Sequence, residues 1–294
     1  MADIYESNVS GVAVGIFDSP AHAIRAVISG AVHCGHVPKF LDDSKECERQ
    51  AKAVEDNMKP RENSVGGGTL GPSLFENAQN PQAYFDDCAR AGTIVENAIG
   101  KVMPASLRQV IRDFENLADY GYSVHPVVHH GQPAAYNRGL IFRSTSKEIV
   151  RIHEDLSNLK GLARFEFEIA NASMVMAHNL YLRNTPSEGL LTMYGKRFTP
   201  EEKAQIDLDY AHLAPEERPA VQASGYYYPD ELLDGVHSET VQVETGDYLV
   251  FRADFPHKVH NADGESSFSG QQRVSWNGFF TIRHDGIDEV LYWT

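Results

Sequence analysis

A His-x-Asp motif follows a run of residues that favours a β-strand. The run Ile149–Ile152 is rich in β-branched side chains, and His153 and Asp155 come directly after it. Alternate residues of an extended strand face the same side, so both side chains can point at one ion. Imidazole and carboxylate groups are ligands of divalent transition metals. The motif indicates a metal site, although such a pair also arises by chance in a chain with 13 histidines and 41 acidic residues.

A third candidate ligand, His257, stands far downstream. It follows a turn at Gly246 and an apolar run that ends at Phe251, and this pattern is typical of a strand. Only a barrel-like fold brings residues so distant in sequence to one ion. Two histidines and one carboxylate on one side of an ion leave its other positions open, as expected for non-haem Fe(II) oxygenases. His260 is the alternative third ligand, but the interval from Phe251 and the Lys-Val that follows favour His257.

An Arg-x-Ser pair lies sixteen residues after His257. Arg273 and Ser275 share one face of an expected strand, so a guanidinium fork and a hydroxyl can hold one carboxylate. The neighbours Val274 and Trp276 indicate a partly buried element, where an arginine needs an anionic partner. The alternative is a plain surface arginine.

In this order, the motifs resemble those of the Fe(II)/2-oxoglutarate-dependent oxygenase superfamily. The resemblance implies an α+β fold with a double-stranded β-helix (jelly roll, cupin-like) core and N-terminal helices packed on it. It also implies that His153, Asp155 and His257 bind Fe(II). Arg273, aided by Ser275, would then bind the distal carboxylate of 2-oxoglutarate.

Within that superfamily the chain is most similar to the small-molecule hydroxylases and halogenases typified by the hapalindole-type alkaloid halogenases. The similarity includes the opening segment 11–17, the Tyr84-Phe85 helix and the run 140–153. Those halogenases have glycine in place of Asp155, which leaves a position on iron for chloride. The resemblance therefore implies hydroxylation of an unactivated C–H bond in a small molecule, either an amino-acid derivative or a natural-product intermediate. O2 would be the co-substrate, and succinate and CO2 would be released; desaturation, ring closure and halogenation remain alternative outcomes.

Two other classes of protein are compatible with the metal motif. One is a cupin-like metal enzyme that does not use 2-oxoglutarate, and the other is a jelly-roll binding module without activity. Arg273 and Ser275 argue against the first, because such chemistry needs no carboxylate anchor. A complete motif with its anchor argues against the second.

Helices dominate the expected structure before residue 122 and strands dominate it afterwards. We expect a strand at 11–17, a loop at 42–72, and three helices, at 20–27, 80–100 and 106–121. Short β-forming runs follow at 140–142, 149–152, 165–169, 173–177, 180–182, 190–194, 240–243, 248–251 and 274–282. We predict one oxygenase domain over 1–294, with a mainly helical part at 1–122. The jelly-roll core would occupy 123–294 and contain a polar, partly helical insertion at 199–219.

Composition limits the partners and the compartment. The chain has 294 residues, 42% of them hydrophobic and 23% charged, with a formal net charge of −15. Such a surface repels phosphate backbones, so we expect no nucleic acid as a partner. The small-molecule substrate is what the resemblance implies. No run of 18 apolar residues and no signal-like N-terminus occurs, and three cysteines without a CxxC spacing favour a reducing compartment. We therefore expect a cytoplasmic protein without membrane contact; its oligomeric state is left open.

Other polar and aromatic residues receive structural interpretations. His33 and His36 lack a matching second pair of ligands, so a structural role is favoured. Surface salt bridges are favoured over charge near the barrel mouth for three arginines, Arg143, Arg151 and Arg164. Three segments are candidates for walls or covers of a pocket, namely Phe165 with Phe167, Gly66–Gly68, and Tyr226–Tyr228.

Overall fold

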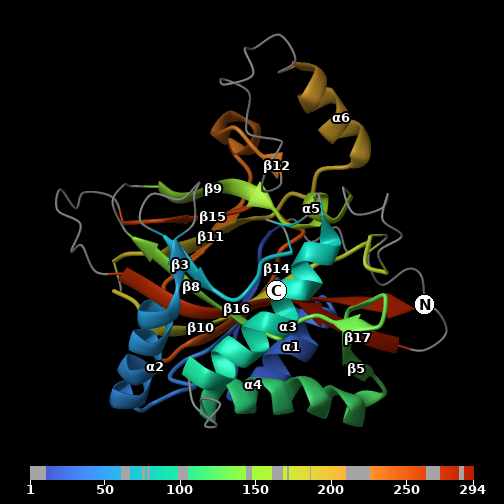
Figure 1. The fold of residues 1–294 in the computed structure, drawn as a ribbon. Coiled ribbons are helices and arrows are strands. Elements are labelled where there is room, and N and C mark those ends of the chain that lie inside the picture. Colours follow the sequence, from blue (N-terminus) through green and yellow to red (C-terminus); the bar gives the residue numbers. More distant parts are fainter. Residues whose placement is uncertain are drawn as a thin grey trace.

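Two β-sheets face each other in this protein, and helices cover the outer side of the larger sheet (Figure 1). The computed structural model describes residues 11–60, 67–74, 77, 80–98, 105–143, 148–160, 168–170, 172–185, 187–209, 226–262, 272–284 and 288–294. The helices are α1 (Pro20–Ile28), α2 (Ser44–Asn57), α3 (Pro81–Ala98), α4 (Ala105–Asn116), α5 (Leu156–Lys160) and α6 (Pro200–Asp209). Short 3-10 turns occur at Leu117–Tyr120 and Asp230–Leu233.

Ten strands form the large sheet within the described part of the chain, and five form the small sheet. The large sheet contains β1 (Val14–Ile16), β2 (Cys34–Val37), β3 (Lys59–Pro60), β4 (Gly68–Leu70), β5 (Ser123–Pro126), β8 (Arg138–Arg143), β10 (Met176–Arg183), β14 (Tyr248–Arg252), β16 (Gln272–His284) and β17 (Asp288–Trp293). The small sheet contains, in spatial order, β12 (Tyr226–Tyr227), β9 (Glu148–Glu154), β15 (His257–His260), β11 (Leu190–Tyr194) and β13 (Ser238–Val241). A separate hairpin joins β6 (Val128–His129) and β7 (Gln132–Pro133).

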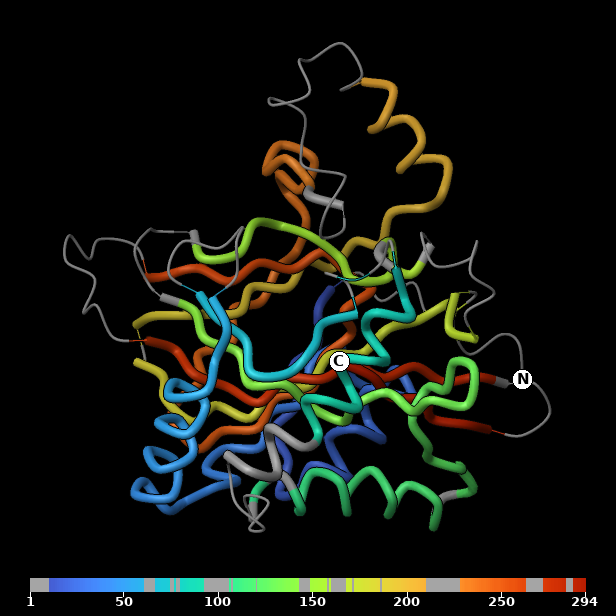
Figure 2. Tube along the Cα trace, viewed as in Figure 1, coloured from blue at the N-terminus to red at the C-terminus, as the bar shows by residue number. Residues whose placement is uncertain are grey.

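The chain crosses repeatedly between the two sheets. Strands β8, β10, β14 and β16 are neighbours in the large sheet, whereas β9, β15, β11 and β13 are neighbours in the small one. Figure 2 shows the result: green, yellow and red segments, distant in sequence, lie together in both layers. This exchange brings the end of β9 beside the start of β15, the two places where the sequence predicts metal ligands.

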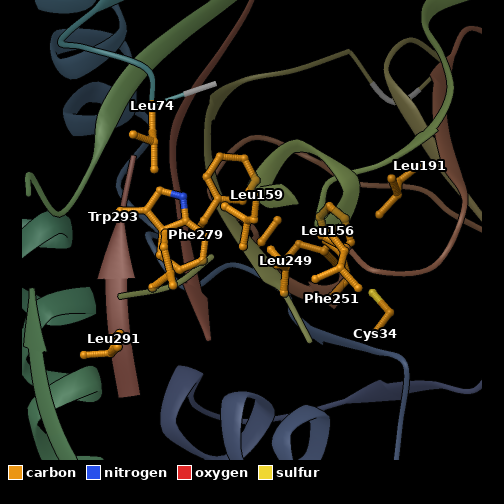
Figure 3. Packing of buried hydrophobic residues seen from close by; sticks show 14 of the residues in the cluster. Cys34, Leu74, Leu156, Leu159, Leu191, Leu249, Phe251, Phe279, Leu291 and Trp293 are labelled. Carbon is orange, nitrogen blue, oxygen red and sulfur yellow. The ribbon is translucent and has the colours of Figure 1, made fainter. Parts of the chain in front are cut away.

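Alternation along the strands separates two hydrophobic cores. Ala177 and Tyr181 of β10 face the small sheet and pack in one core with Met193 of β11. Met176 and Leu180 face the opposite way, toward α1, α2 and α4. Figure 3 shows part of the core between the sheets, with contributions from Leu191, Leu249, Phe251 and Phe279. Functional side chains on the inner faces are therefore held by packed neighbours on both sides.

The helices predicted in the N-terminal part are confirmed, with one addition. Helix α1 begins after Ser19, whose side chain accepts a hydrogen bond from the His22 backbone N–H. The predicted loop at 42–72 is wrong over most of its length, because α2 occupies Ser44–Asn57. Asp43 caps this helix, and its buried face carries Cys47, Ala51 and Val54 among many charged residues.

The strand predictions are confirmed at most positions. The runs at 173–177 and 180–182 are one strand, β10. The expected strand at 165–169 lies largely outside the described residues, and so does 210–219 of the insertion, whose first part is α6. Strand β17, which the sequence does not predict, pairs with β16. No helix in the described ranges is long and apolar enough to cross a membrane.

Candidate metal and carboxylate site

His153, Asp155 and His257 converge on the inner side of the small sheet. His153 and His257 are directly opposite each other in the antiparallel pair β9–β15. One ligand atom from each of the three side chains lies within 4.8 Å of the others. Asp155 approaches both imidazoles, with 3.9 Å between Oδ1 and His153 Nε2 and 3.6 Å between Oδ2 and His257 Nε2. Among the described residues this is the single group of three or more His, Cys, Asp or Glu side chains with such spacing.

Hydrogen bonds orient both imidazole rings. His153 Nδ1 donates to the Arg151 carbonyl oxygen at 2.7 Å, and His257 Nδ1 donates to the Phe255 carbonyl oxygen at 2.9 Å. With the Nδ1 proton engaged in each ring, Nε2 carries the lone pair that a metal needs. Both Nε2 atoms face the Asp155 carboxylate. The arrangement is suited to two imidazole ligands and one carboxylate ligand.

The side chains of His153, Asp155 and His257 are largely buried, which makes it costly for Asp155 to be ionised without a nearby positive charge. Their exposed fractions are 12% for His153, 9% for Asp155 and 4% for His257. Burial raises the pKa of Asp155 to about 6, against the opposing charges of His153 and Arg138. Burial, with the charge of His153, holds the pKa of His257 well below its ordinary value, so the ring is neutral and able to bind a metal. A divalent cation would offset the cost of ionising Asp155 in this environment.

Arg273 lies buried on the inner face of the large sheet. Its Nη2 donates to the Tyr181 hydroxyl at 2.9 Å and its Nη1 to the Gly189 carbonyl at 3.3 Å, while Nε has no hydrogen-bond partner. None of the carboxylates in the described ranges forms an ion pair with it. Ser275, one step along β16 on the same face, is completely buried and its Oγ also lacks a partner. A buried guanidinium with orphaned donors beside it fits an anionic group.

Tyr181 is a further candidate that the sequence analysis does not include. Its ring lies 4.7 Å from the Arg273 guanidinium carbon, and it is paired with Ser275 in the β10–β16 register. Burial raises the pKa of Tyr181, so its hydroxyl keeps its proton and can donate it to an anion while accepting from Arg273. The signal that identifies it is this cross-strand register, which the sequence alone does not provide.

The competing histidines lie elsewhere. His260 Nε2 is 2.7 Å from Thr192 Oγ1 on the outer face of the small sheet, and its Nδ1 is 3.0 Å from the Asn261 carbonyl. His36 Nε2 pairs with Asp247 at 2.8 Å, and His33 Nδ1 accepts from the Ala13 N–H. These contacts agree with structural roles.

Of the segments predicted to wall or cover a pocket, the structure describes Tyr228 away from the proposed metal ligands. Tyr228 is buried against Phe198 on the outer face of the small sheet, with ring centroids 4.4 Å apart. Phe165, Phe167 and Gly66 lie outside the described residues, as does Arg164.

Comparison with known proteins gives one relative in sequence and two informative structures. No model of a known protein family matches the chain. It is 29% identical over 292 residues to an L-isoleucine 3(1)-dioxygenase of Pantoea ananatis (strain AJ13355), which covers 92% of this chain and 88% of that protein. The fold of the present chain resembles that of an N-substituted L-amino acid dioxygenase from Burkholderia ambifaria AMMD. The TM-score is 0.58 at 9% sequence identity, and the match covers 93% of this chain and 91% of that enzyme. The same enzyme in complex with alpha-KG gives a TM-score of 0.56 at 10% identity.

Proposed function

We propose that this chain is an Fe(II)/2-oxoglutarate-dependent dioxygenase that hydroxylates an unactivated C–H bond of a free amino acid or a close derivative. The observation that carries the proposal is the convergence of His153, Asp155 and His257 from β9 and β15, with Arg273 buried opposite them in the large sheet. The names of the sequence relative and of the structural neighbour, both amino-acid dioxygenases, support the substrate class. O2 would be consumed, and succinate and CO2 released.

The strand order supports a double-stranded β-helix as the core. Eight strands, β8 to β11 and β13 to β16, divide four and four between the sheets, and six of the seven connections between successive strands of this set change sheet. We infer one domain over 1–294, whose helical part, 1–122, packs on the large sheet. The insertion that begins at α6 covers the outer face of the small sheet.

The residues fit the two cofactors. His153 and His257 would bind Fe(II) through Nε2, and Asp155 through its carboxylate. Arg273 would hold the distal carboxylate of 2-oxoglutarate, with the Ser275 hydroxyl as a second donor and the Tyr181 hydroxyl as a third. When bound, iron and 2-oxoglutarate together with O2 supply the oxidising power to attack a C–H bond.

The protein's own contribution is orientation and exclusion of water. Carbonyl groups at Arg151 and Phe255 hold the two imidazoles in the tautomer that exposes Nε2. The ring of Phe251 meets His257 edge-on, with centroids 5.0 Å apart, and belongs to the apolar core between the sheets. This apolar wall shields the reacting groups from water and stray oxidation.

Asp155 favours hydroxylation over halogenation. A carboxylate at this position would occupy the place on iron that chloride needs. The narrower resemblance to alkaloid halogenases stays a prediction, and desaturation or ring closure would use the same residues.

Anaerobic titration tests the cofactor assignment directly. Addition of Fe(II) and 2-oxoglutarate to the wild-type protein should produce a weak visible charge-transfer band, and Arg273→Ala should diminish it. A panel of the twenty common amino acids, with succinate as the measured product, then tests the substrate class. Absence of the band in the wild-type protein, or an undiminished band in Arg273→Ala, would refute the proposal. Turnover of a test substrate without 2-oxoglutarate would instead favour a cupin-like metal enzyme.

A further inference from the structure

A four-residue turn, 253–256, connects β14 of the large sheet to β15 of the small sheet. The Phe255 carbonyl oxygen of this turn accepts a hydrogen bond from His257 Nδ1 at 2.9 Å. The Ala253 carbonyl oxygen accepts one from the Asp155 backbone N–H at 2.7 Å. Two carbonyl groups of one turn therefore hold two of the three proposed metal ligands, one through its ring and the other through its backbone.

A buried ion pair encloses the first half of this turn. The Asp254 carboxylate is completely buried, and the Arg252 guanidinium donates to both of its oxygens, from Nε and from Nη2, each at 2.8 Å. Arg197 also approaches this carboxylate, with 3.4 Å between its Nε and Asp254 Oδ2. A two-point contact between a planar guanidinium and a carboxylate fixes their relative orientation as well as their distance. The backbone between residues 252 and 254 is thereby held in one shape.

Arg252 also constrains Phe255, the residue that orients His257. The Arg252 carbonyl accepts from the Phe255 N–H at 3.3 Å, and the Arg252 guanidinium carbon lies 5.3 Å from the centroid of the Phe255 ring. The other contact of this ring is with His33, which meets it edge-on with centroids 4.9 Å apart. The His33 carbonyl in turn accepts from the Arg252 N–H at 2.9 Å. Arg252 thus acts on Phe255 through its backbone and through its side chain.

A charged pair is a costly way to shape a buried turn. Two charges lose their hydration, and apolar residues of similar volume often give equal or greater stability. What the pair provides is direction, because a guanidinium and a carboxylate meet in one preferred geometry whereas apolar contacts do not. Positions where a sequence departs from the apolar pattern in this way are commonly functional. Here the direction is imposed on a turn that carries two carbonyl groups of the proposed metal site.

We propose that Arg252 and Asp254 are positioning residues of the metal site. They act through the two carbonyl groups of the turn 253–256, which set the backbone of Asp155 and the ring of His257. The inference rests on the proposed function, since it takes these two residues as metal ligands. An ion pair with a structural role alone would change only the stability of the protein. A positioning pair also changes the affinity for the metal and the geometry in which the metal is bound.

Co(II) binding to Arg252→Met tests this role without turnover. The substituted side chain keeps an unbranched apolar stem but loses the fork, so the turn is no longer constrained. Competition with a chelator should give a Kd for Co(II) at least about tenfold above that of the wild type, as when a group that orients a metal ligand is removed. The visible d–d bands of bound Co(II) should also shift, because they depend on the arrangement of the ligands. Arg252→Lys keeps the charge without the planar fork and should give an intermediate Kd.

Arg183→Met is the matched control. Arg183 of β10 forms ion pairs with Glu48 and Glu55 of α2, on the side of the large sheet that the helices cover. Its replacement also removes an arginine held by carboxylates, so it should lower the thermal unfolding midpoint. It should leave the Kd for Co(II) within twofold of the wild type and the d–d bands unchanged, because Arg183 does not belong to the turn before His257.

A second pair of variants keeps the test decisive. If the thermal unfolding midpoint shows that Arg252→Met is unfolded, Arg252→Lys and Asp254→Asn take its place. An unchanged Kd and unchanged d–d bands in the folded variants would overturn the inference. A wild-type protein that binds no Co(II) would overturn it together with the proposed function. A wild-type protein that binds Co(II), but whose bands do not respond to 2-oxoglutarate, would refute the proposed cofactor alone.

Discussion

The inner faces of the two sheets carry different kinds of polar group. The small sheet presents two imidazoles, His153 and His257, with Asp155 just after the end of β9. The large sheet presents two buried guanidinium groups, Arg138 and Arg273. The proposed metal ligands thus stand on one sheet, and Arg273, the proposed anchor of a carboxylate, stands on the other. Because facing sheets pack about 10 Å apart, a small dicarboxylic acid can reach from one set of groups to the other.

This difference means that metal binding and anion binding should be separable by mutation. Each set is held by its own strand pairing, His153 with His257 in β9–β15 and Tyr181 with Ser275 in β10–β16. The packed core between the sheets lies between the two inner faces. Substitutions on one sheet should therefore change the affinity for one cofactor first, whereas catalysis should need both.

The largest effect is expected on the small sheet. His257→Ala removes one of three proposed ligands, so the metal affinity should fall at least about a hundredfold and succinate formation should stop. Metal content after dialysis and succinate release measure the two effects. Asp155→Gly should also abolish hydroxylation, and should allow chlorination only if the substrate is still positioned correctly. Retention of one metal per chain in His257→Ala would remove this residue from the proposed ligand set.

A smaller and different loss is expected on the large sheet. Arg273→Ala should keep the metal but weaken 2-oxoglutarate binding by about ten- to a hundredfold, because a charge-assisted contact is lost. Arg273→Lys should restore part of the affinity, since lysine keeps the charge without the planar fork. Titration of 2-oxoglutarate into the metal-loaded variants distinguishes them. Simultaneous loss of metal in Arg273→Ala would contradict the separation of the two sheets.

Short-range patterns allow the ligand residues to be predicted from the sequence, but not the partners across strands. His153 and Asp155 stand two apart at the end of a β-forming run, and Arg273 and Ser275 repeat that spacing. Tyr181 becomes a neighbour of Arg273 and Ser275 only through the register of β10 and β16, which local spacing does not encode.

Helix α2 is not predicted from the sequence, because it too depends on contacts with residues distant in the chain. Its exposed side is so rich in charge that the segment has the composition of a loop. Its helical character becomes evident through the narrow buried stripe of Cys47, Ala51 and Val54. The large sheet supplies the surface for this stripe, and tertiary packing of this kind stabilises most protein helices.

A third test concerns the outer face of the small sheet, where Glu154 stands between two proposed ligands. Its buried carboxylate pairs with Lys203 of α6. Lys203→Met leaves this carboxylate without the charge that faces it, so the free energy of unfolding should fall by about 3 kcal/mol. Chemical denaturation measures the fall, and the double variant with Glu154→Gln should recover much of it. We expect metal affinity to change less than tenfold; a larger change would show that the insertion positions the ligands.

The smallest effect is expected at His260, which shares β15 with His257 but faces outward. Its ring contacts Thr192 on the neighbouring strand rather than Asp155. His260→Ala should leave metal content and succinate formation within about twofold of the wild type, and should cost about 1 kcal/mol of stability for the lost hydrogen bond. His260→Gln keeps a polar group near Thr192 and should recover part of that stability. If His260→Ala lost the metal while His257→Ala kept it, the third ligand would be His260, and the proposed division between inner and outer faces would be wrong.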